Sequence, residues 1–204
     1  KKSVPAENYP FCTIDPSVGV VAVPDERLYK LAEFSKTKKT IPAAVEFVDI
    51  AGLVKGASEG EGLGNQFLSH IRETDAIAEV VRIFEDDNVI HVHGAVDPVS
   101  DIETINLELI LADDQTVTKR LANIEKDVKR GAKEAVKEKE VLTKISGALK
   151  SGQLARSVAL VEDEAPLVRT LHLLTMKPIL YVLNKKAGGK NLDEMGDERY
   201  TKLL

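Results

Sequence analysis

The sequence has only one cysteine in 204 residues, Cys12. A single thiol excludes a disulfide within the chain and fits a reducing compartment. The sequence also lacks any apolar run near the ~20 residues that a membrane-spanning helix needs, and no signal-peptide pattern opens it. We therefore expect a cytoplasmic protein that has no contact with a membrane.

The composition does not indicate a fibrous or disordered chain. Hydrophobic residues make up 43% of the sequence, enough for one domain with a real core, or for one domain with a sizeable insertion. The first residue is Lys1 rather than methionine, and the sequence begins and ends in the middle of a pattern of strands and helices. We therefore expect a fragment of a longer protein.

Charge is distributed unevenly behind a net charge of −5. Residues 113–156 carry 11 Lys or Arg against 7 Asp or Glu, whereas the remainder carries 17 against 26. A basic segment on an acidic body predicts a polyanionic partner, in the first place RNA. A solvated helix face with ion pairs of mixed sign would give the same composition, because Glu134, Glu138 and Glu140 lie among the lysines.

One stretch organises the rest of the sequence. The apolar run 43–48 ends at Asp49, Gly52 follows where the chain must turn, and a glycine-rich segment continues to Gly64. In nucleoside triphosphatases an aspartate at such a strand end holds Mg²⁺, and the glycine amide approaches a terminal phosphate because no Cβ obstructs it. A plain strand-to-helix loop shows the same D-x-x-G pattern, so the motif needs further support.

Apolar strands alternate with amphipathic helices, which predicts an α/β fold with a mostly parallel sheet. The first helix, 25–34, places Leu28, Leu31 and Phe34 at helical spacing, and we expect them to face the core. Ligands of parallel sheets bind at the carboxyl ends of the strands, where a loop carries His91 and His93 as candidates for proton transfer. The predicted strands are 19–24, 43–48, 76–84 and 177–183, and the other predicted helices are 66–72, 101–112 and 162–174.

Residues 113–160 show a heptad pattern instead. Two apolar stripes lie on either side of Gly131, and each is too narrow to form a stable helix alone. We therefore predict an antiparallel helical hairpin, inserted into a partial nucleotide-binding domain that comprises 1–112 and 161–204. The first stripe is Val117, Leu121, Ile124 and Val128, and the second is Ala135, Leu142, Ile145 and Leu149.

Several runs closely resemble the Obg-like ATPases of the YchF family. They are Y-P-F-C-T-I-D-P at 9–16, E-F-V-D-I-A-G-L-V-K-G-A at 46–57, G-E-G-L-G-N-Q-F-L at 60–68 and I-R-E-T-D-A at 71–76. The resemblance implies a P-loop nucleoside triphosphatase with a helical insertion and a TGS domain after it. It also implies ATP as the substrate, with GTP as an alternative, and association with the ribosome as a translation-linked or stress-linked switch.

The resemblance also implies roles for single residues. By position, Thr13 and Asp49 correspond to the Mg²⁺ residues, and Gly52 to the contact with the γ-phosphate. Leu53 lies where Ras-type enzymes carry the glutamine that positions the attacking water. Hydrolysis must therefore draw on another group, and the family's candidate is the histidine that corresponds to His91.

The strand at 177–183 leads into Asn184 and Lys185, as in the N-K-x-D motif that recognises the base. Ala187 stands in place of the acid of this motif, so the residue that would read guanine is absent. The predicted preference for ATP therefore comes from the resemblance.

The phosphate-binding loop G-x-x-x-x-G-K-[ST] and its strand are not in these 204 residues, and neither is the TGS domain. We therefore expect the chain alone to bind nucleotide poorly or not at all, and the activity to belong to the parent protein. Two alternatives stay open. One is a noncatalytic RNA- or ribosome-binding module that uses the basic hairpin, and the other is a scaffold whose nucleotide site has decayed.

Overall fold

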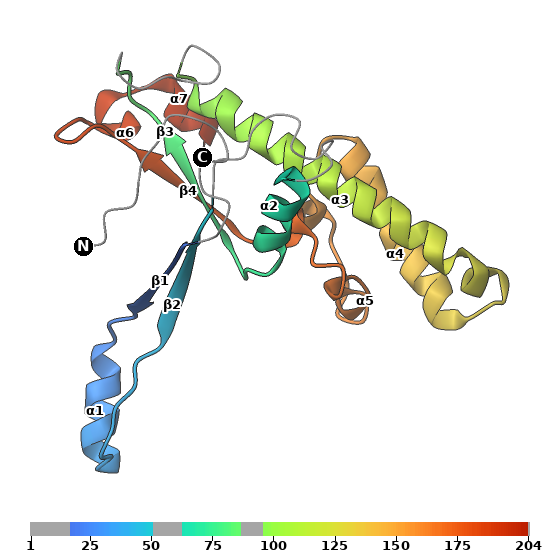
Figure 1. Cartoon of the computed structure of the whole chain (residues 1–204), viewed down its shortest axis with the longest axis horizontal. Coiled ribbons are helices and arrows are strands. Elements are labelled where there is room, and N and C mark those ends of the chain that lie inside the picture. The colour runs from blue at the N-terminus through green and yellow to red at the C-terminus, as the bar shows by residue number, and fades with distance from the viewer. Residues whose placement is uncertain (1–16, 51–62, 87–95, 204) are drawn as a thin grey trace.

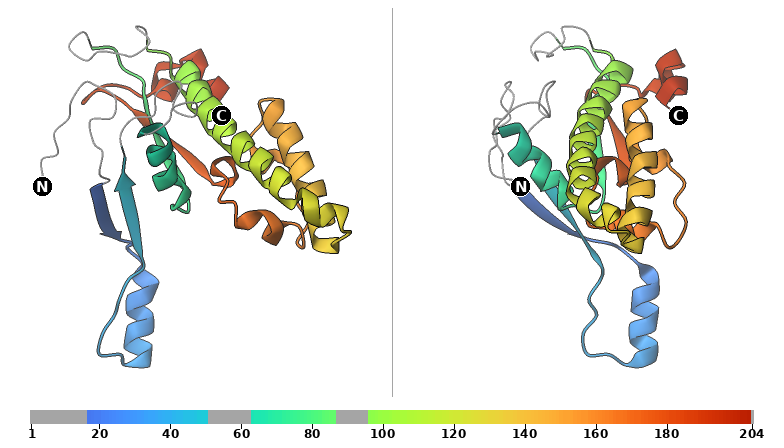
Figure 2. Two further views of the ribbon diagram at one scale, coloured as in Figure 1. Left: turned by 45° about the vertical axis from the view of Figure 1, so that its right-hand side comes forward. Right: turned by 90° about the vertical axis from the view of Figure 1, so that its right-hand side faces the viewer.

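A computed structural model describes residues 17–50, 63–86 and 96–203, without the side chains of 63–66. Three parts are visible in Figure 1: an arm formed by residues 17–49, a pair of parallel strands with short helices beside it, and a long helical hairpin. The arm and the hairpin project in different directions, also when the molecule is turned (Figure 2). The predicted α/β fold with an antiparallel hairpin is confirmed.

The arm contains two strands and one helix. Strands β1 (Ser17–Ala22) and β2 (Ala44–Asp49) pair antiparallel, with Ser17 opposite Asp49. Helix α1 (Glu26–Ser35) begins after Asp25, whose carboxylate accepts a hydrogen bond from the Arg27 amide at 3.0 Å. An aspartate in this place satisfies an amide that has no partner within the helix, which is why the helix begins here.

The predicted core-facing side of α1 is wrong. Phe34 is 87% exposed and Leu31 is 62% exposed, while Leu28 is only partly buried. The helix lies at the far end of the arm, away from the other described helices (Figure 1). Helical spacing predicted an apolar face correctly, but it could not supply an element to pack against it.

The second strand pair is parallel. Strands β3 (Ile77–Arg82) and β4 (Ile179–Asn184) pair in register from Ile77 opposite Ile179 to Arg82 opposite Asn184. Their inner face meets α3 (Pro98–Lys129), where the Asn106 amide donates to the Tyr181 hydroxyl at 3.3 Å. The outer face is open, and Val80 on it is 66% exposed.

The described strands thus form two separate pairs instead of the predicted single sheet, and only one of the pairs is parallel. Strand β3, predicted at 76–84, is covered by described elements on one face only. Alternation along the strand explains the difference, because successive side chains point to opposite faces and only one face is covered.

The predicted helical hairpin is confirmed. Helix α3 runs without a break through the predicted boundary at 112, and α4 (Lys133–Lys150) returns antiparallel beside it (Figure 1). Gly131 has φ +76°, a left-handed conformation that glycine adopts without steric cost, and it allows the tight turn between the helices. The buried seam includes Val117, Ile124, Val141, Leu142, Ile145 and Leu149.

The predicted helix 162–174 is much shorter in the structure. Helix α5 covers only Ala165–Arg169, His172 has a left-handed φ of 46°, and a 3₁₀ turn, η2 (Leu174–Met176), precedes β4. The amides of Leu174 and Thr175 donate to the side chain of Asp113, so they are not available for a helix. The remaining elements are η1 (Ala155–Ser157), α2 (Leu63–Arg72), α6 (Leu192–Met195) and α7 (Glu198–Leu203).

Candidate nucleotide-binding site

Four of the seven predicted site residues, namely Thr13, Gly52, Leu53 and His91, lie outside the described residues. The structure describes the other three, Asp49, Asn184 and Lys185.

Asp49 is the last residue of β2 and its side chain is exposed. The next residue, Ile50, packs against an apolar cluster that includes Phe67 and Leu68 of α2. The end of β2 therefore lies beside this cluster, and the Asp49 side chain is exposed.

Asn184 ends β4 with an exposed side chain, and its carbonyl accepts from the Ile83 amide at 3.1 Å. Lys185 follows, with its ammonium 4.0 Å from a carboxylate oxygen of Glu194. Both side chains are at the carboxyl end of the parallel pair, the edge at which ligands of such sheets bind.

Asp49 and Asn184 end strands of different pairs. Ile50 contacts the cluster against which Ile77 and Ile179, the first residues of β3 and β4, also pack. Asn184 lies five residues farther along β4, or about 17 Å at the usual rise of a strand. Because β2 and β4 belong to different pairs among the described strands, their carboxyl ends do not share the edge of one sheet.

Helix α2 connects the glycine-rich segment to the rest of the molecule. Its buried Phe67, Leu68 and Ile71 pack in one cluster with Leu109 and Ala112 of α3 and with Leu174. The apolar face predicted for 66–72 is therefore confirmed. It packs α2, the helix at the end of the glycine-rich segment, against α3 at the base of the hairpin.

A buried aspartate that the sequence analysis missed holds this region together. Asp113 of α3 is fully buried and accepts hydrogen bonds from the Leu174 amide at 2.9 Å and from both the amide and the hydroxyl of Thr175 at 2.7 Å. The Thr175 hydroxyl oxygen accepts in turn from the Ala155 amide at 2.9 Å. Burial raises the pKa of Asp113, and the three donors and nearby Arg72 oppose that shift.

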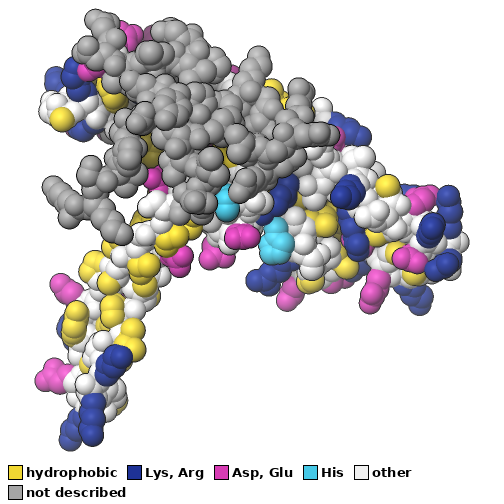
Figure 3. All heavy atoms as spheres, viewed as in Figure 1, with side chains coloured by type: hydrophobic (Ala, Val, Ile, Leu, Met, Phe, Trp, Pro, Cys, Tyr) yellow, Lys and Arg dark blue, Asp and Glu magenta, His cyan; other side chains and the backbone are white. Residues whose placement is uncertain are grey.

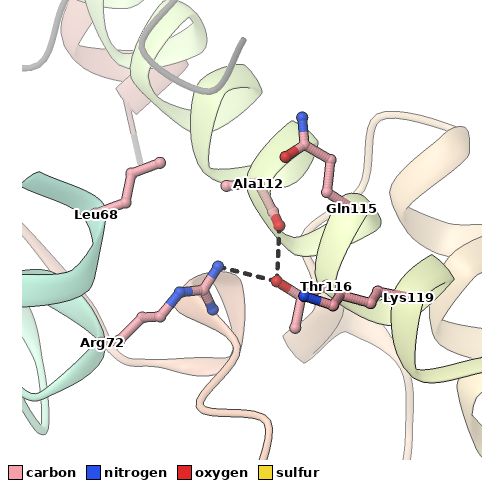
Figure 4. Close-up of a pocket in the computed structure, with 6 residues that line it drawn as sticks. All are labelled: Leu68, Arg72, Ala112, Gln115, Thr116 and Lys119. Atoms are coloured by element: carbon pink, nitrogen blue, oxygen red, sulfur yellow. Dashed lines mark hydrogen bonds between the residues drawn. The ribbon is translucent and has the colours of Figure 1, made fainter. Parts of the chain in front are cut away.

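Arg72, at the end of α2, reaches across to α3 (Figure 4). Its Nη2 donates to the Thr116 hydroxyl at 3.0 Å, and its Nη1 donates to the His172 carbonyl at 3.3 Å and lies 3.7 Å from Asp113. A pocket of about 190 Å³ lies beside this bridge. Its lining combines an apolar floor with polar and basic groups: Leu68, Arg72, Ala112, Gln115, Thr116 and Lys119.

Comparisons with known proteins identify the family. Residues 1–144 match the family model described as 50S ribosome-binding GTPase. The chain is 59% identical over 196 residues to the ribosome-binding ATPase YchF of Bacillus subtilis, covering 96% of this chain and 53% of that protein. The chain belongs to the YchF family. The predicted resemblance is thereby confirmed.

Two further YchF relatives agree with this assignment. The ribosome-binding ATPase YchF of Escherichia coli O157:H7 is 51% identical over 189 residues, which cover 93% of this chain and 52% of that protein. The solved structure of the Schizosaccharomyces pombe YchF GTPase matches with a TM-score of 0.71 and 39% identity, covering 96% of this chain and 55% of that chain. The chain thus spans about half the length of the curated YchF relatives it matches.

Ion pairs account for many of the charges on the hairpin of this YchF chain. Arg120 pairs with Glu138 at 2.6 Å, Lys139 with Glu125 at 3.1 Å, and Lys144 with Glu164 at 2.9 Å. Figure 3 also shows Lys and Arg side chains around the free end of the hairpin. The exposed basic residues at this tip are Lys126, Lys129, Arg130 and Lys133. The structure therefore has both the mixed-sign pairs and an exposed basic tip.

No helix in the described part of this YchF chain is long and apolar enough to cross a bilayer.

A partly buried carboxyl, Glu79, lies on the inner face of β3. Its Oε2 atom is buried and has no hydrogen-bond partner among the described residues, and its strand neighbour in the register is Tyr181. Burial raises the pKa of Glu79 to about 7, and the negative charge of Asp101 adds to the shift. The packing of α3 on the β3–β4 pair therefore includes a group that titrates near neutral pH.

We expect Glu79→Gln to stabilise the fold at pH 8 by about 1–2 kcal/mol, less than the full linkage value because the side chain is partly exposed to solvent. The folded state keeps the Glu79 proton while the unfolded chain has already lost it, so stability falls as the pH rises from about 4.5 to about 7. The glutamine should therefore give almost no gain at pH 5. Urea unfolding at both pH values measures this, with exposed Glu103→Gln as the control, and an equal gain at both pH values would contradict it.

Proposed function

We propose that the full-length protein is a ribosome-associated nucleoside triphosphatase. It hydrolyses ATP, with GTP as an alternative substrate, to the diphosphate and phosphate, and acts as a translation-linked or stress-linked switch. The position of Asp49 carries this proposal: an exposed carboxylate ends β2 directly before the D-x-x-G segment, and the helix after that segment is fixed on α3. The names of the bacterial relatives, ribosome-binding ATPases, support the substrate and the partner.

The proposed metal is Mg²⁺. An exposed carboxylate fits this ion, which prefers oxygen ligands and takes only one or two from the protein while phosphates and waters supply the rest. We assign Asp49 and Thr13 to it. When bound, Mg²⁺ neutralises charge on the β- and γ-phosphates.

We assign the remaining roles to residues by their position in the motifs. The Gly52 amide donates to the γ-phosphate, and Asn184 and Lys185 contact the base at the end of β4. Leu53 has no polar atom with which to hold a water molecule, so we assign that role to His91.

The test uses the full-length protein. We expect Mg²⁺-dependent release of phosphate from ATP, and co-sedimentation with ribosomes that is lost when Lys126, Lys129, Arg130 and Lys133 are all changed to Glu. The matched control reverses four exposed lysines of the arm, Lys30, Lys36, Lys38 and Lys39, and should still co-sediment. Ribosome binding without any hydrolysis would favour the noncatalytic binding module instead.

A further inference from the structure

The end of α2 is held by polar contacts from two other segments. From its own last residue, the Arg72 guanidinium joins Thr116 of α3 to the carbonyl of His172. The Lys177 ammonium donates to the carbonyls of Arg72, at 3.1 Å, and Thr74. The last carbonyls of a helix have no partner within it, so this ammonium fixes an end that would otherwise be solvated or fray.

Apolar packing alone leaves the position of α2 on α3 incompletely determined. The pocket of about 190 Å³ is lined by Leu68 and Arg72 on one helix and by Ala112, Thr116 and Lys119 on the other, at the edge of the apolar cluster that Leu68 and Ala112 share. Figure 4 shows the Arg72 side chain extending across this gap to the Thr116 hydroxyl. Hydrogen bonds are directional, whereas apolar contacts are not, so this bridge sets the relative position of the helices.

Helix α3 is long enough to carry a displacement to the hairpin. It is continuous from Pro98 to Lys129, and thirteen residues separate Thr116 from Lys129, or about 20 Å at 1.5 Å per residue. Arg72 holds α3 near its middle, and Asp113, one turn earlier, holds it to Thr175. A shift of α2 therefore moves the far half of α3, and α4 with it.

We propose that Arg72 is a positioning residue that couples the nucleotide site to the helical hairpin. It makes α2 and α3 move together, so that the hairpin presents its basic tip differently in different nucleotide states. The inference rests on the proposed function, because it needs a nucleotide at the segment before α2 and a ribosome at the hairpin. Coupling of this kind must be reciprocal: the ribosome changes nucleotide affinity by the same factor by which the nucleotide changes ribosome affinity.

The experiment measures ribosome affinity of the full-length protein with a nonhydrolysable ATP analogue and with ADP, beside its basal ATP hydrolysis. We expect the two affinities to differ at least about fivefold in the wild type. Arg72→Gln and Thr116→Val should each bring the ratio below about twofold and leave basal hydrolysis within about twofold. Thr116→Val is the milder change, because valine has a similar shape and the change removes only the hydroxyl, which accepts from Arg72 and donates to the Ala112 carbonyl at 3.0 Å within α3.

Arg156→Gln is the matched control. Its guanidinium donates to the Lys177 carbonyl at 3.4 Å and does not form the bridge between α2 and α3, so the ratio should stay at the wild-type value. A wild-type ratio in Thr116→Val would overturn the coupling, and so would a wild type that hydrolyses ATP but binds ribosomes equally in both states. The proposed function survives either result, whereas a wild type without hydrolysis overturns both. If Arg72→Gln does not fold, Thr116→Val decides alone.

Discussion

Replacement of Asp113 by alanine should lower the free energy of opening of the hairpin base by about 4 kcal/mol. The change leaves three donors, the Leu174 amide and the amide and hydroxyl of Thr175, without their acceptor in a site that is closed to solvent. It also removes the carboxylate near the Arg72 guanidinium. Each buried donor left unpaired costs about 1–3 kcal/mol, so the sum is a large part of a typical domain's stability.

Hydrogen exchange of the α3 and η2 amides measures this loss in the full-length protein without assuming that the whole chain unfolds in one step. Asp114→Ala is the matched control. Asp114 is the next residue of the same helix, partly exposed, and its carboxylate accepts a single long hydrogen bond from Ser146 at 3.4 Å. We expect that control to cost less than about 1 kcal/mol. Similar losses for the two variants would show that the buried network is not the source of the stability.

The second large effect is expected in catalysis. Asp49→Asn in the full-length protein should reduce ATP turnover about 10²- to 10³-fold and weaken the dependence on Mg²⁺, because a neutral amide holds the cation less strongly than a carboxylate does. The fold should be unaffected, since the side chain is exposed at the end of β2. A phosphate-release assay over a range of Mg²⁺ concentrations measures both quantities, and excess Mg²⁺ should recover part of the activity.

Glu46→Gln provides the control, because Glu46 is also exposed and lies three residues earlier on the same strand. His91→Ala, measured in the same assay, should reduce turnover about 10²-fold and leave nucleotide affinity unchanged, as expected for a group that acts on the attacking water. If Asp49→Asn turns over ATP at the wild-type rate, the carboxylate does not hold the metal and the proposed site is wrong.

Some elements could be predicted from the sequence better than others, because an apolar face is buried only where another element packs against it. The hairpin and the apolar face of α2 followed from the spacing of apolar residues, because each buries a continuous stripe against a neighbour. The α1 face did not become a core, although its spacing was equally regular, because no described element covers it. Spacing identifies which residues can be buried together, and a partner is needed to bury them.

For Asp113, the spacing of residues also predicted burial without predicting the partner. It stands four residues after Leu109 and four before Val117, within the buried stripe of α3, and this position was a signal that it would be buried. The donors that bind its carboxylate could not be predicted from the sequence, since Thr175 is 62 residues away in the chain. The same long-range contact ended the helix predicted for 162–174, because it drew two amides away from helical hydrogen bonds.

The amino-acid sequence was therefore sufficient for the family, the α/β class and the helical hairpin, because motifs and apolar periodicity are local properties of the chain. Three features required the folded molecule: the bridge from Arg72 to Thr116, the buried Asp113 network, and the placement of β2 and β4 in different strand pairs. Each of these depends on which distant segments meet and in which register, and local spacing carries no information about that choice.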